Sequence, residues 1–381
     1  RAKGQMSLPG DAGTGTFIVP ADAVSRLRLI RTDSIGPVTY RQLIARFGDA
    51  ETALKALPDL ARRGNRSLAL HPESEALAEL ETAATLGAHL LFLGTPDYPA
   101  LLSGTETAPP VLYARGDLAL LDRPAVAIVG ARNASAAGTR FARQLALDLA
   151  EADYVVVSGL ARGIDAAAHV AALDRGTIAV VAGGVDVPYP PDHADLMARI
   201  AEQGLVIAEQ PPGIEPQARH FPRRNRIIAG LSAGTIVVEG APKSGSLITA
   251  RIAADLGREV MAVPGSPLDP RAQGCNLLIR EGATLIQTAA DVLEALSTLS
   301  GQPALRFNAA EPLPLPDFGP ALAPDPAARA ALLALLSPAP VHVDELIRLS
   351  TLPAAQVASV LLDLELEGAL TRHAGARVAL G

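Results

Sequence analysis

Residues 116–297 alternate short apolar runs with helical segments, and this alternation constrains the fold more than any other feature of the chain. The apolar runs have strand length and lie at Val126–Val129, Tyr154–Val157, Ile178–Val181, Leu205–Ala208, Thr235–Val238 and Glu259–Val263. Helical segments such as Gly138–Ala150 and Leu247–Leu256 fall between most of them. Apolar strands separated by helices indicate a parallel sheet that is covered on both faces. Right-handed crossovers then predict an α/β fold with a Rossmann-like, doubly wound, mostly parallel sheet.

The chain also predicts a domain on each side of this core. Residues 22–115 are typical of small helices with irregular structure, which we interpret as a SAM/helix-hairpin-helix-like helical domain. The segment Ser34–Pro37 predicts a tight turn before a second helix. The amides of such a turn can hold a DNA phosphate. A helical bundle without a ligand fits as well, because only one glycine marks the turn, and both interpretations stay open.

The C-terminal third predicts a linker and a small domain. Residues 298–325 contain six prolines and are typical of an extended linker. In residues 326–381 we expect helices at Ala327–Leu336, Asp344–Leu349 and Pro353–Glu367, followed by strands at Ala369–His373 and Arg377–Leu380. Three helices and a hairpin indicate a winged-helix domain.

Composition excludes several classes of protein. Cys275 is the only cysteine, which excludes an intramolecular disulfide and a cysteine-based metal cluster. The first 20 residues lack the apolar run of a signal peptide, and no apolar stretch reaches the ~18–20 residues of a membrane helix. We therefore expect a cytoplasmic protein without a membrane partner. The run Asp192–Asp195 resembles a metal site only weakly, because Asp192 also suits the cap of an ordinary helix, and we expect no metal.

Charge restricts the way in which this chain could bind a polyanion. The net charge is −7, with 33 Lys and Arg against 40 Asp and Glu, which argues against a broadly basic nucleic-acid binder. Four arginines nevertheless fall within eight residues, with no acid between them: Arg219, Arg223, Arg224 and Arg226. Any polyanion site must therefore be local.

The predicted strand ends concentrate glycines, helix starts and cations. In a doubly wound sheet, ligands bind beyond the carboxyl ends of the strands. The turns there favour a phosphate-bearing ligand, but the chain has neither the G-x-G-x-x-G pattern of dinucleotide sites nor the P-loop pattern, so we expect no cofactor. The predicted ligand-binding residues in the turns are Gly130, Ala131, Arg132, Ser135, Gly159, Arg162, Gly163, Lys243, Ser244, Gly245 and Ser246.

The arginine-rich segment adds a second group of candidates. They are Arg219, Phe221, Arg223, Arg224, Asn225 and Arg226. The arginines at helical spacing spread around the helix, so we expect some of them to form internal ion pairs and the rest to meet phosphates. Phe221 is a candidate for stacking on a base. Because aromatic residues are scarce, backbone contacts should dominate and sequence preference should be weak.

Catalytic patterns are weak in this chain. Ser158, Asp165 and His169 lie close in sequence, but Ser158 lacks the G-x-S-x-G pattern of a nucleophile elbow. His169 lies on a face of small residues, where a core histidine is the simpler interpretation. We expect no catalytic residues and no enzymatic activity.

These motifs together resemble the bacterial DNA-processing protein A family (DprA/Smf). The resemblance covers about residues 25–297 and rests on the segments 127–132, 158–165, 221–228, 244–250 and 262–266, with 96–99 and 109–113 upstream. The tail resembles the winged-helix domain that some members carry. Ala131 departs from the serine usual in the family's G-S-R turn.

The resemblance implies a role in natural transformation and recombination. Members of the family bind incoming single-stranded DNA, protect it and load the RecA recombinase onto it. The resemblance also implies a homodimer built through the Rossmann-like core. On this interpretation the partners are single-stranded DNA, RecA and a second copy of the chain.

Two other functions stay open. A phosphoribohydrolase-like enzyme of a related Rossmann group would carry P-G-G-x-G-T-x-x-E, whereas Thr249 stands here roughly where that glutamate would be. The chain could also be a protein-interaction scaffold. For the tail, the expected recognition helix Pro353–Glu367 has no Lys or Arg and carries three acids, Asp363, Glu365 and Glu367. We therefore predict that residues 326–381 form a protein-contact or regulatory module and do not read duplex DNA in a sequence-specific way.

Overall fold

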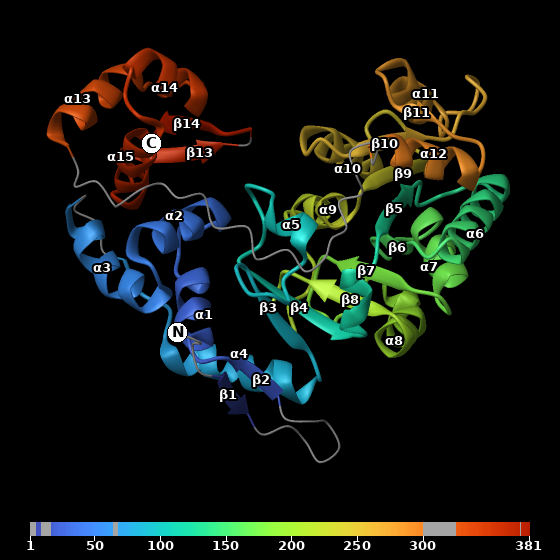
Figure 1. Ribbon diagram of the computed structural model, residues 1–381, viewed down its shortest axis with the longest axis horizontal. Coiled ribbons are helices and arrows are strands. Elements are labelled where there is room, and N and C mark those ends of the chain that lie inside the picture. Colours follow the sequence, from blue (N-terminus) through green and yellow to red (C-terminus); the bar gives the residue numbers. More distant parts are fainter. Residues whose placement is uncertain (1–4, 9–16, 64–67, 300–324, 374) are drawn as a thin grey trace. The chain divides into compact units, whose positions relative to one another are not determined.

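The computed structural model describes residues 5–8, 17–63, 68–299, 325–373 and 375–381 (Figure 1). The chain divides into two compact units. Unit 1 comprises residues 1–6, 18–80 and 314–381, and unit 2 comprises residues 7–17 and 81–313.

Unit 2 is built on a nine-stranded sheet, which confirms the predicted α/β fold. The strand order is β11-β10-β9-β5-β6-β7-β8-β4-β3. The neighbours from β11 to β8 are parallel, whereas β4 pairs antiparallel with β8 and β3 pairs antiparallel with β4. The strands are β3 (His89–Phe92), β4 (Val111–Gly116), β5 (Ala125–Gly130), β6 (Val155–Ser158), β7 (Thr177–Val181), β8 (Leu205–Ala208), β9 (Gly234–Glu239), β10 (Glu259–Ala262) and β11 (Thr284–Leu285).

The sheet begins earlier in the chain than the sequence predicts. Strands β3 and β4 lie in residues 22–115, which we expected to be helical or irregular. The segment between them holds only the four-residue helix α5 (Ala100–Ser103), so the strand–helix alternation that identifies the core is missing there. Their antiparallel pairing needs no crossover helix. The sheet therefore starts at His89, ahead of the boundary drawn at residue 116.

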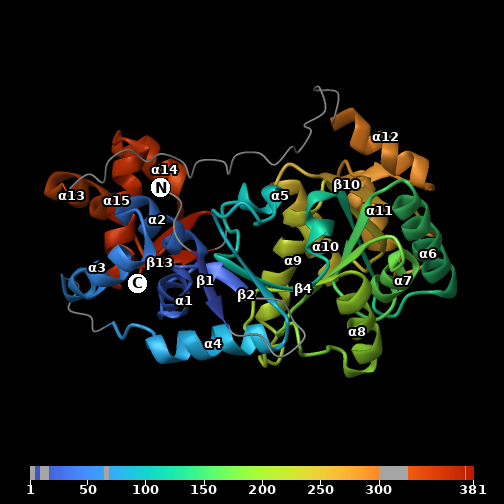
Figure 2. The same ribbon diagram turned by 60° about the horizontal axis from the view of Figure 1, so that its bottom comes forward.

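Helices cover both faces of the sheet (Figures 1 and 2). One face packs against α6 (Ala136–Glu151), α7 (Ile164–Ala172) and α12 (Ala289–Leu299). The other packs against α5, α9 (His220–Leu231), α10 (Gly245–Asp255) and α11 (Gln273–Arg280). Strand β5 shows why both faces are needed: Val126 and Ile128 join the first cluster, while Ala127 and Val129 join the second. Successive strand residues point to opposite faces, so an entirely apolar strand must be buried on both.

Short elements complete the description of this part of the chain. Helix α8 (Ala194–Gln203) packs against β7 and β8. The 3-10 turns η1 (Leu118–Asp122) and η2 (Pro191–His193) precede β5 and α8. Near the start of the chain, strands β1 (Gln5–Leu8) and β2 (Phe17–Pro20) form a separate two-stranded sheet.

Unit 1 contains the helical domain and the winged helix that the sequence predicts. Helix α1 (Ala23–Arg31) is followed by the expected turn and by α2 (Pro37–Phe47), with Gly36 as its N-cap. Helices α3 (Ala50–Arg63) and α4 (Glu73–Thr85) follow. The winged helix comprises α13 (Pro326–Leu335), α14 (Val343–Ser350), α15 (Ala354–Leu366) and the sheet β12 (Val341–His342), β14 (Arg377–Leu380), β13 (Leu370–His373). Most of the predicted linker, residues 300–324, lies outside the described residues.

Helix α15 packs against α2 and α3 within unit 1 (Figure 1). Leu362 and Leu366 are buried in one cluster with residues of α1 to α3, including Leu29, Tyr40 and Leu57. The helix expected to be a recognition helix therefore supplies part of the core of the helical domain.

All three acids at the C-terminal end of α15 form ion pairs or hydrogen bonds with other residues of unit 1. Asp363 pairs with Arg46 at 2.5 Å, and both side chains are largely buried. Glu365 accepts hydrogen bonds from Thr39 and Arg372. Glu367 pairs with Arg329. The acids of α15 are therefore bound by side chains of the same unit.

In the described part of the chain, no single helix is long and apolar enough to cross a membrane. Only α14 and α15 taken together, at a bend of 119°, reach the required length and composition.

We predict that Asp363→Asn destabilises unit 1 by roughly 3 kcal/mol, because it leaves the Arg46 guanidinium buried without its counter-charge. Chemical denaturation of the full chain, followed by hydrogen exchange in α2 and α15, would measure the loss. Glu345→Gln is the matched control, because its pair with Arg348 is exposed and should contribute under ~0.5 kcal/mol. Equal effects of the two substitutions would contradict the importance of the buried pair.

Candidate nucleic-acid interface

A pocket lies where the carboxyl ends of three parallel strands meet. The turn after β5 supplies Arg132, and the turn after β6 supplies Gly159, Ala161 and Arg162. Val181, Ala182, Tyr189 and Pro190 come from the end of β7 and the loop behind it, and Phe221 and Arg224 come from α9. The pocket thus brings together Arg132, Gly159, Arg162, Phe221 and Arg224 of the predicted set.

Two aromatic rings and an arginine form a stack at this pocket. The guanidinium carbon of Arg132 lies 5.5 Å from the centroid of the Phe221 ring. The ring of Tyr189 meets Phe221 edge to face, with centroids 5.4 Å apart. Arg132 and Tyr189 are exposed. A cationic group and open aromatic surface at one place can hold both a phosphate and a base.

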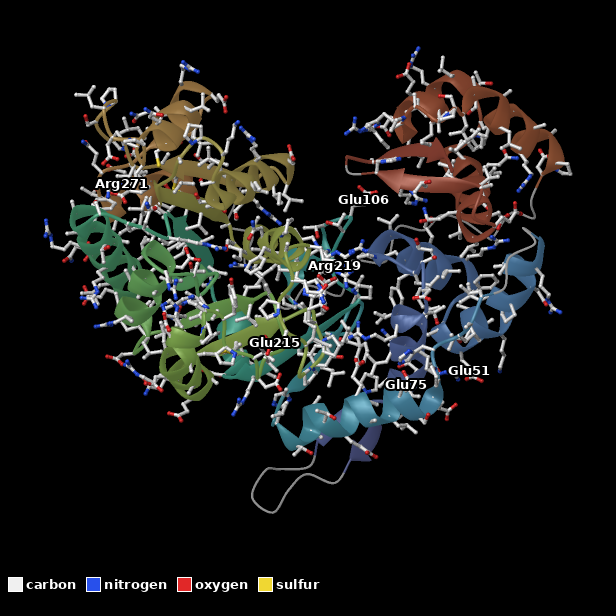
Figure 3. The ribbon with its side chains drawn as sticks, turned by 180° about the vertical axis from the view of Figure 1, so that it is seen from behind. Glu51, Glu75, Glu106, Glu215, Arg219 and Arg271 are labelled. Carbon is white, nitrogen blue, oxygen red and sulfur yellow. The ribbon has the colours of Figure 1, made fainter. Side chains whose placement is uncertain are left out.

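The structure sorts the four arginines of the arginine-rich segment. Arg226 is paired with Glu209 at 2.5 Å, with both side chains mostly buried. Arg224 is buried beside Asp165. Arg219 and Arg223 are exposed, and within the described residues neither forms an ion pair with a carboxylate. Arg226 therefore serves the fold, while Arg219 and Arg223 are available to an outside anion. Figure 3 labels Arg219 and Glu215 on the segment that leads into α9.

Asp165 organises the floor of the pocket. Its carboxylate accepts hydrogen bonds from the backbone N–H groups of Gly159 and Ala161, at 3.1 and 3.3 Å. Burial raises the pKa of Asp165, an effect that the nearby Arg224 and the two amides oppose. Burial also lowers the pKa of Arg224, while Asp165 counteracts the shift. The pair keeps one guanidinium at the base of the pocket.

Two of the predicted glycines are required by packing. A side chain at Gly159 would overlap the Arg224 guanidinium. Gly163 has a φ of 77°, and a Cβ there would lie 2.3 Å from the carbonyl oxygen of Ala131. Gly130 packs against the side chain of Ile164. These positions shape the turns that carry Arg132 and Arg162. The Gly159 amide already donates to Asp165, and contacts of the Gly130 and Gly163 amides with a ligand stay a prediction.

The remaining predicted residues lie outside the pocket lining. Lys243 is exposed before α10, and within the described residues it makes no ion pair. The hydroxyls of Ser244 and Ser246 hydrogen-bond to each other at 2.8 Å, next to the exposed Gly245. Asn225 is buried and donates to the carbonyl of Gly245. Asn225 lies on α9, and the other residues of this second group lie at the start of α10.

Two residues of the pocket region escaped the prediction of the site. Tyr189 completes the aromatic stack, and only its place after a strand end could have indicated this. Asp192 pairs with Arg162 at 2.5 Å, with both side chains exposed. The expectation that Asp192 caps a helix is wrong, because the N-cap of α8 is His193. Among the described residues, no group of three His, Cys, Asp or Glu side chains is placed to hold a metal.

The residues with catalytic potential are occupied by structural contacts. Ser158 is fully buried and donates to the carbonyl of Ile128 at 2.6 Å. Thr249 is buried and donates to the carbonyl of Gly245. The burial of Cys275 raises the pKa of its thiol to about 12. None of the three combines a reactive group with access to the pocket.

His169 is a core histidine held in one protonation state. Its Nε2 accepts from the N–H of Leu160 at 3.3 Å. Its Nδ1 lies 2.7 Å from the hydroxyl of Thr177, which itself donates to Val156. Thr177 therefore accepts from Nδ1, and no acceptor is left for a proton on Nε2. Burial, with a smaller effect from Arg224, lowers the pKa of His169 to about 3.

Comparison with known proteins matches all three parts of the chain. The model of the DNA recombination-mediator protein A family matches residues 89–297. Models for a DprA-like N-terminal HHH domain and a DprA winged helix domain match residues 20–83 and 316–376.

Similar proteins cover most of the chain. Protein Smf of Synechocystis is 33% identical over 90% of this chain and 95% of its own length. Protein Smf of Escherichia coli is 38% identical over 77% of this chain and 77% of its own length. The X-ray structure of DNA processing protein A from Streptococcus pneumoniae is 35% identical, covers 71% of this chain and 97% of that one, and has a TM-score of 0.61. A structure of DNA processing protein A from Helicobacter pylori is described as giving insight into its single-stranded DNA binding mode. It is 29% identical, covers 55% of this chain and 96% of that one, and has a TM-score of 0.50.

We predict that His169 makes the fold sensitive to acid. The folded chain leaves His169 unprotonated down to about pH 3, whereas the unfolded chain protonates it below about 6.5. Stability should therefore fall as the pH drops below about 6.5, by about 2 kcal/mol at pH 5 from this residue. Urea unfolding at pH 7 and pH 5 would compare the wild type with His169→Gln, which can still donate and accept. A variant with the same loss as the wild type would refute the assignment.

Proposed function

Because the chain belongs to the DNA recombination-mediator protein A family, we propose that it binds single-stranded DNA at the carboxyl edge of its nine-stranded sheet. The observation that carries the proposal is the stack of Arg132, Phe221 and Tyr189 at the pocket mouth, above the buried Arg224. The Helicobacter pylori relative is described as binding single-stranded DNA, and its fold matches this core.

Electrostatics support a polyanion as the ligand. The whole chain is acidic, yet the exposed Arg132 and Arg162 line the pocket. Arg219 and Arg223 are exposed on the segment that carries Phe221, and Lys243 is exposed at the start of α10. Exposed cations are the usual contacts to phosphate oxygens. A strand of DNA would let several of them act at once.

The aromatic pair favours single strands over duplex. Bases in a duplex are stacked on each other and present no open face, whereas an unpaired base can stack on Phe221 or Tyr189. Stacking tolerates every base, and phosphate contacts carry no sequence information, so sequence preference should be weak.

The wider role follows from the family. We infer a function in natural transformation and recombination, with protection of incoming strands and loading of RecA, in the cytoplasm. We also infer a homodimer built through the Rossmann-like core. We infer that residues 326–381 contact protein or regulate activity and do not read duplex DNA, because α15 has no cation and its acids pair with Arg46, Arg329 and Arg372 of the same chain.

The alternative is a phosphoribohydrolase-like enzyme. Thr249 is buried at the place expected for the catalytic glutamate, and Ser158 and His169 are bonded to backbone or core groups. These contacts favour a binding protein without catalysis. Release of ribose 5-phosphate from AMP by the purified chain would favour the enzyme.

We predict that Arg132→Ala weakens binding of a single-stranded oligonucleotide by the full chain about tenfold or more. Removal of a charged hydrogen bond costs ~1.5–3 kcal/mol, and 1.4 kcal/mol is tenfold. Fluorescence anisotropy across a salt series should also show a log–log slope that is shallower by about 0.7 for each phosphate that the variant no longer neutralises.

Arg175→Ala is the matched control for this experiment. Arg175 is an exposed arginine that pairs with Glu151 just before β7, at the opposite edge of the sheet, and its removal should change affinity less than twofold. Equal effects of the two substitutions would mean that the site is elsewhere. A flat salt response of the wild type, or equal affinity for duplex, would count against the pocket.

We predict that Asp192→Asn tightens binding of single-stranded DNA two- to fivefold. The exposed pair with Asp192 withdraws Arg162 from the ligand and adds a negative charge beside the pocket, and such pairs contribute ~0–1 kcal/mol to stability. Asp195→Asn, an exposed acid three residues along, is the control and should leave the affinity unchanged. The gain should vanish in Arg162→Ala/Asp192→Asn. Weaker binding by Asp192→Asn would show that the aspartate holds Arg162 in its working position.

A further inference from the structure

The order of the strands defines a second ligand position that the pocket does not use. From β5 the chain adds β6, β7 and β8 on one side, and then returns to place β9 on the other side of β5. Open α/β sheets bind ligands at such a reversal, beyond the carboxyl ends of the strands. A nucleotide phosphate would sit there, on the first turn of the helix after β5, which is α6.

Glu239 occupies this position. It is the last residue of β9, and its carboxylate reaches across to the start of α6. Oε2 accepts from the N–H of Ser135 at 2.9 Å, and Oε1 accepts from the Ser135 hydroxyl at 2.6 Å. Ser135 is the N-cap of α6 and accepts in turn from the N–H of Gly138. A carboxylate bonded to the first turn of a helix makes the contacts that a phosphate would make.

The first turn of α6 is shaped around this carboxylate. Gly138 is buried, and a Cβ there would lie 2.5 Å from the carboxyl carbon of Glu239. Any other residue at 138 would have to push the glutamate away. Gly138 and Glu239 are therefore a matched pair, one on each side of the strand reversal.

The pocket is displaced from the reversal accordingly. Its lining residues come from the turns after β5 and β6, the end of β7 and the loop behind it, and α9. Among the described residues that line it, none belongs to β9 or α10. The pocket therefore lies about one strand away from the β5–β9 reversal, on the side of β6 and β7.

We propose that Glu239 is a specificity residue: it fills the phosphate position at the β5–β9 reversal with the chain's own anion and excludes phosphate monoesters, free nucleotides among them, from that position. A phosphate cannot share the position, because the space is taken and two anions in contact repel. The inference goes beyond DNA binding, and it would stand even if the pocket bound another ligand.

The test is phosphate binding by the full chain with Glu239→Ala, measured by calorimetry at constant ionic strength with inorganic phosphate and separately with AMP. The wild type and Glu202→Ala, an exposed glutamate on α8, should bind phosphate and AMP equally weakly. Glu239→Ala should bind phosphate at least tenfold more tightly than the wild type. A folded Glu239→Ala that binds phosphate no better than the wild type would overturn the proposal.

Two further measurements keep the proposal testable if Glu239→Ala does not fold in chloride buffer. Phosphate should then restore the fold, because it refills the position, and failure of phosphate to do so at ~50 mM would overturn the proposal. Gly138→Ala should lower the melting temperature of the wild type and should cost less in the Glu239→Ala background with phosphate present. Equal costs in both backgrounds would show that the two residues are not coupled.

Discussion

The chain's own carboxylates satisfy backbone N–H groups at the carboxyl ends of its strands, and the character of the site depends on this. Asp165 accepts from two amides of the β6–α7 turn, and Glu239 accepts from the start of α6. In nucleotide-binding proteins of this architecture such amides meet phosphates. Here the amides of Gly159, Ala161 and Ser135 are engaged, so in the proposed interface a polyanion would be held mainly by side chains such as the exposed Arg132 and Arg223.

Under the proposed function, this arrangement explains how an acidic protein can present a site for DNA. Several charged side chains at the strand ends are bound within the fold. Glu239 and Asp165 accept hydrogen bonds from the start of α6 and from the β6–α7 turn, and Arg226 forms a mostly buried ion pair with Glu209. The exposed Arg132 lies over the Phe221 ring, and the exposed Arg162 lines the same pocket. Net charge describes the long-range field, whereas binding depends on the few charges within a Debye length, ~10 Å at 0.1 M salt, of the ligand.

The sequence predicts the core of the sheet well because burial on both faces leaves a continuous apolar signal, as in Val126–Val129. It does not predict β3 and β4, because only the four-residue α5 lies between them, and it does not predict β11, which has only two residues. The turns with Arg132 and Arg162 could be predicted as part of a site, since strand ends gather ligands. The sequence could not assign each arginine, because Arg224 and Arg226 differ from Arg223 only in the acids that meet them, and Asp165 and Glu209 are brought there by tertiary packing.

The same logic applies to the winged helix in unit 1. A helix that lacks cations and ends in Asp363, Glu365 and Glu367 is a poor partner for phosphates, and the structure gives each acid an arginine of its own chain. Leu362 and Leu366 bury the same helix in the core of the helical domain. Exposing α15 would therefore cost both apolar burial and ion pairs. A partner that contacts this domain meets α2, α3 and α15 as one surface, and any partner that needs α15 alone must first supply the energy to separate it.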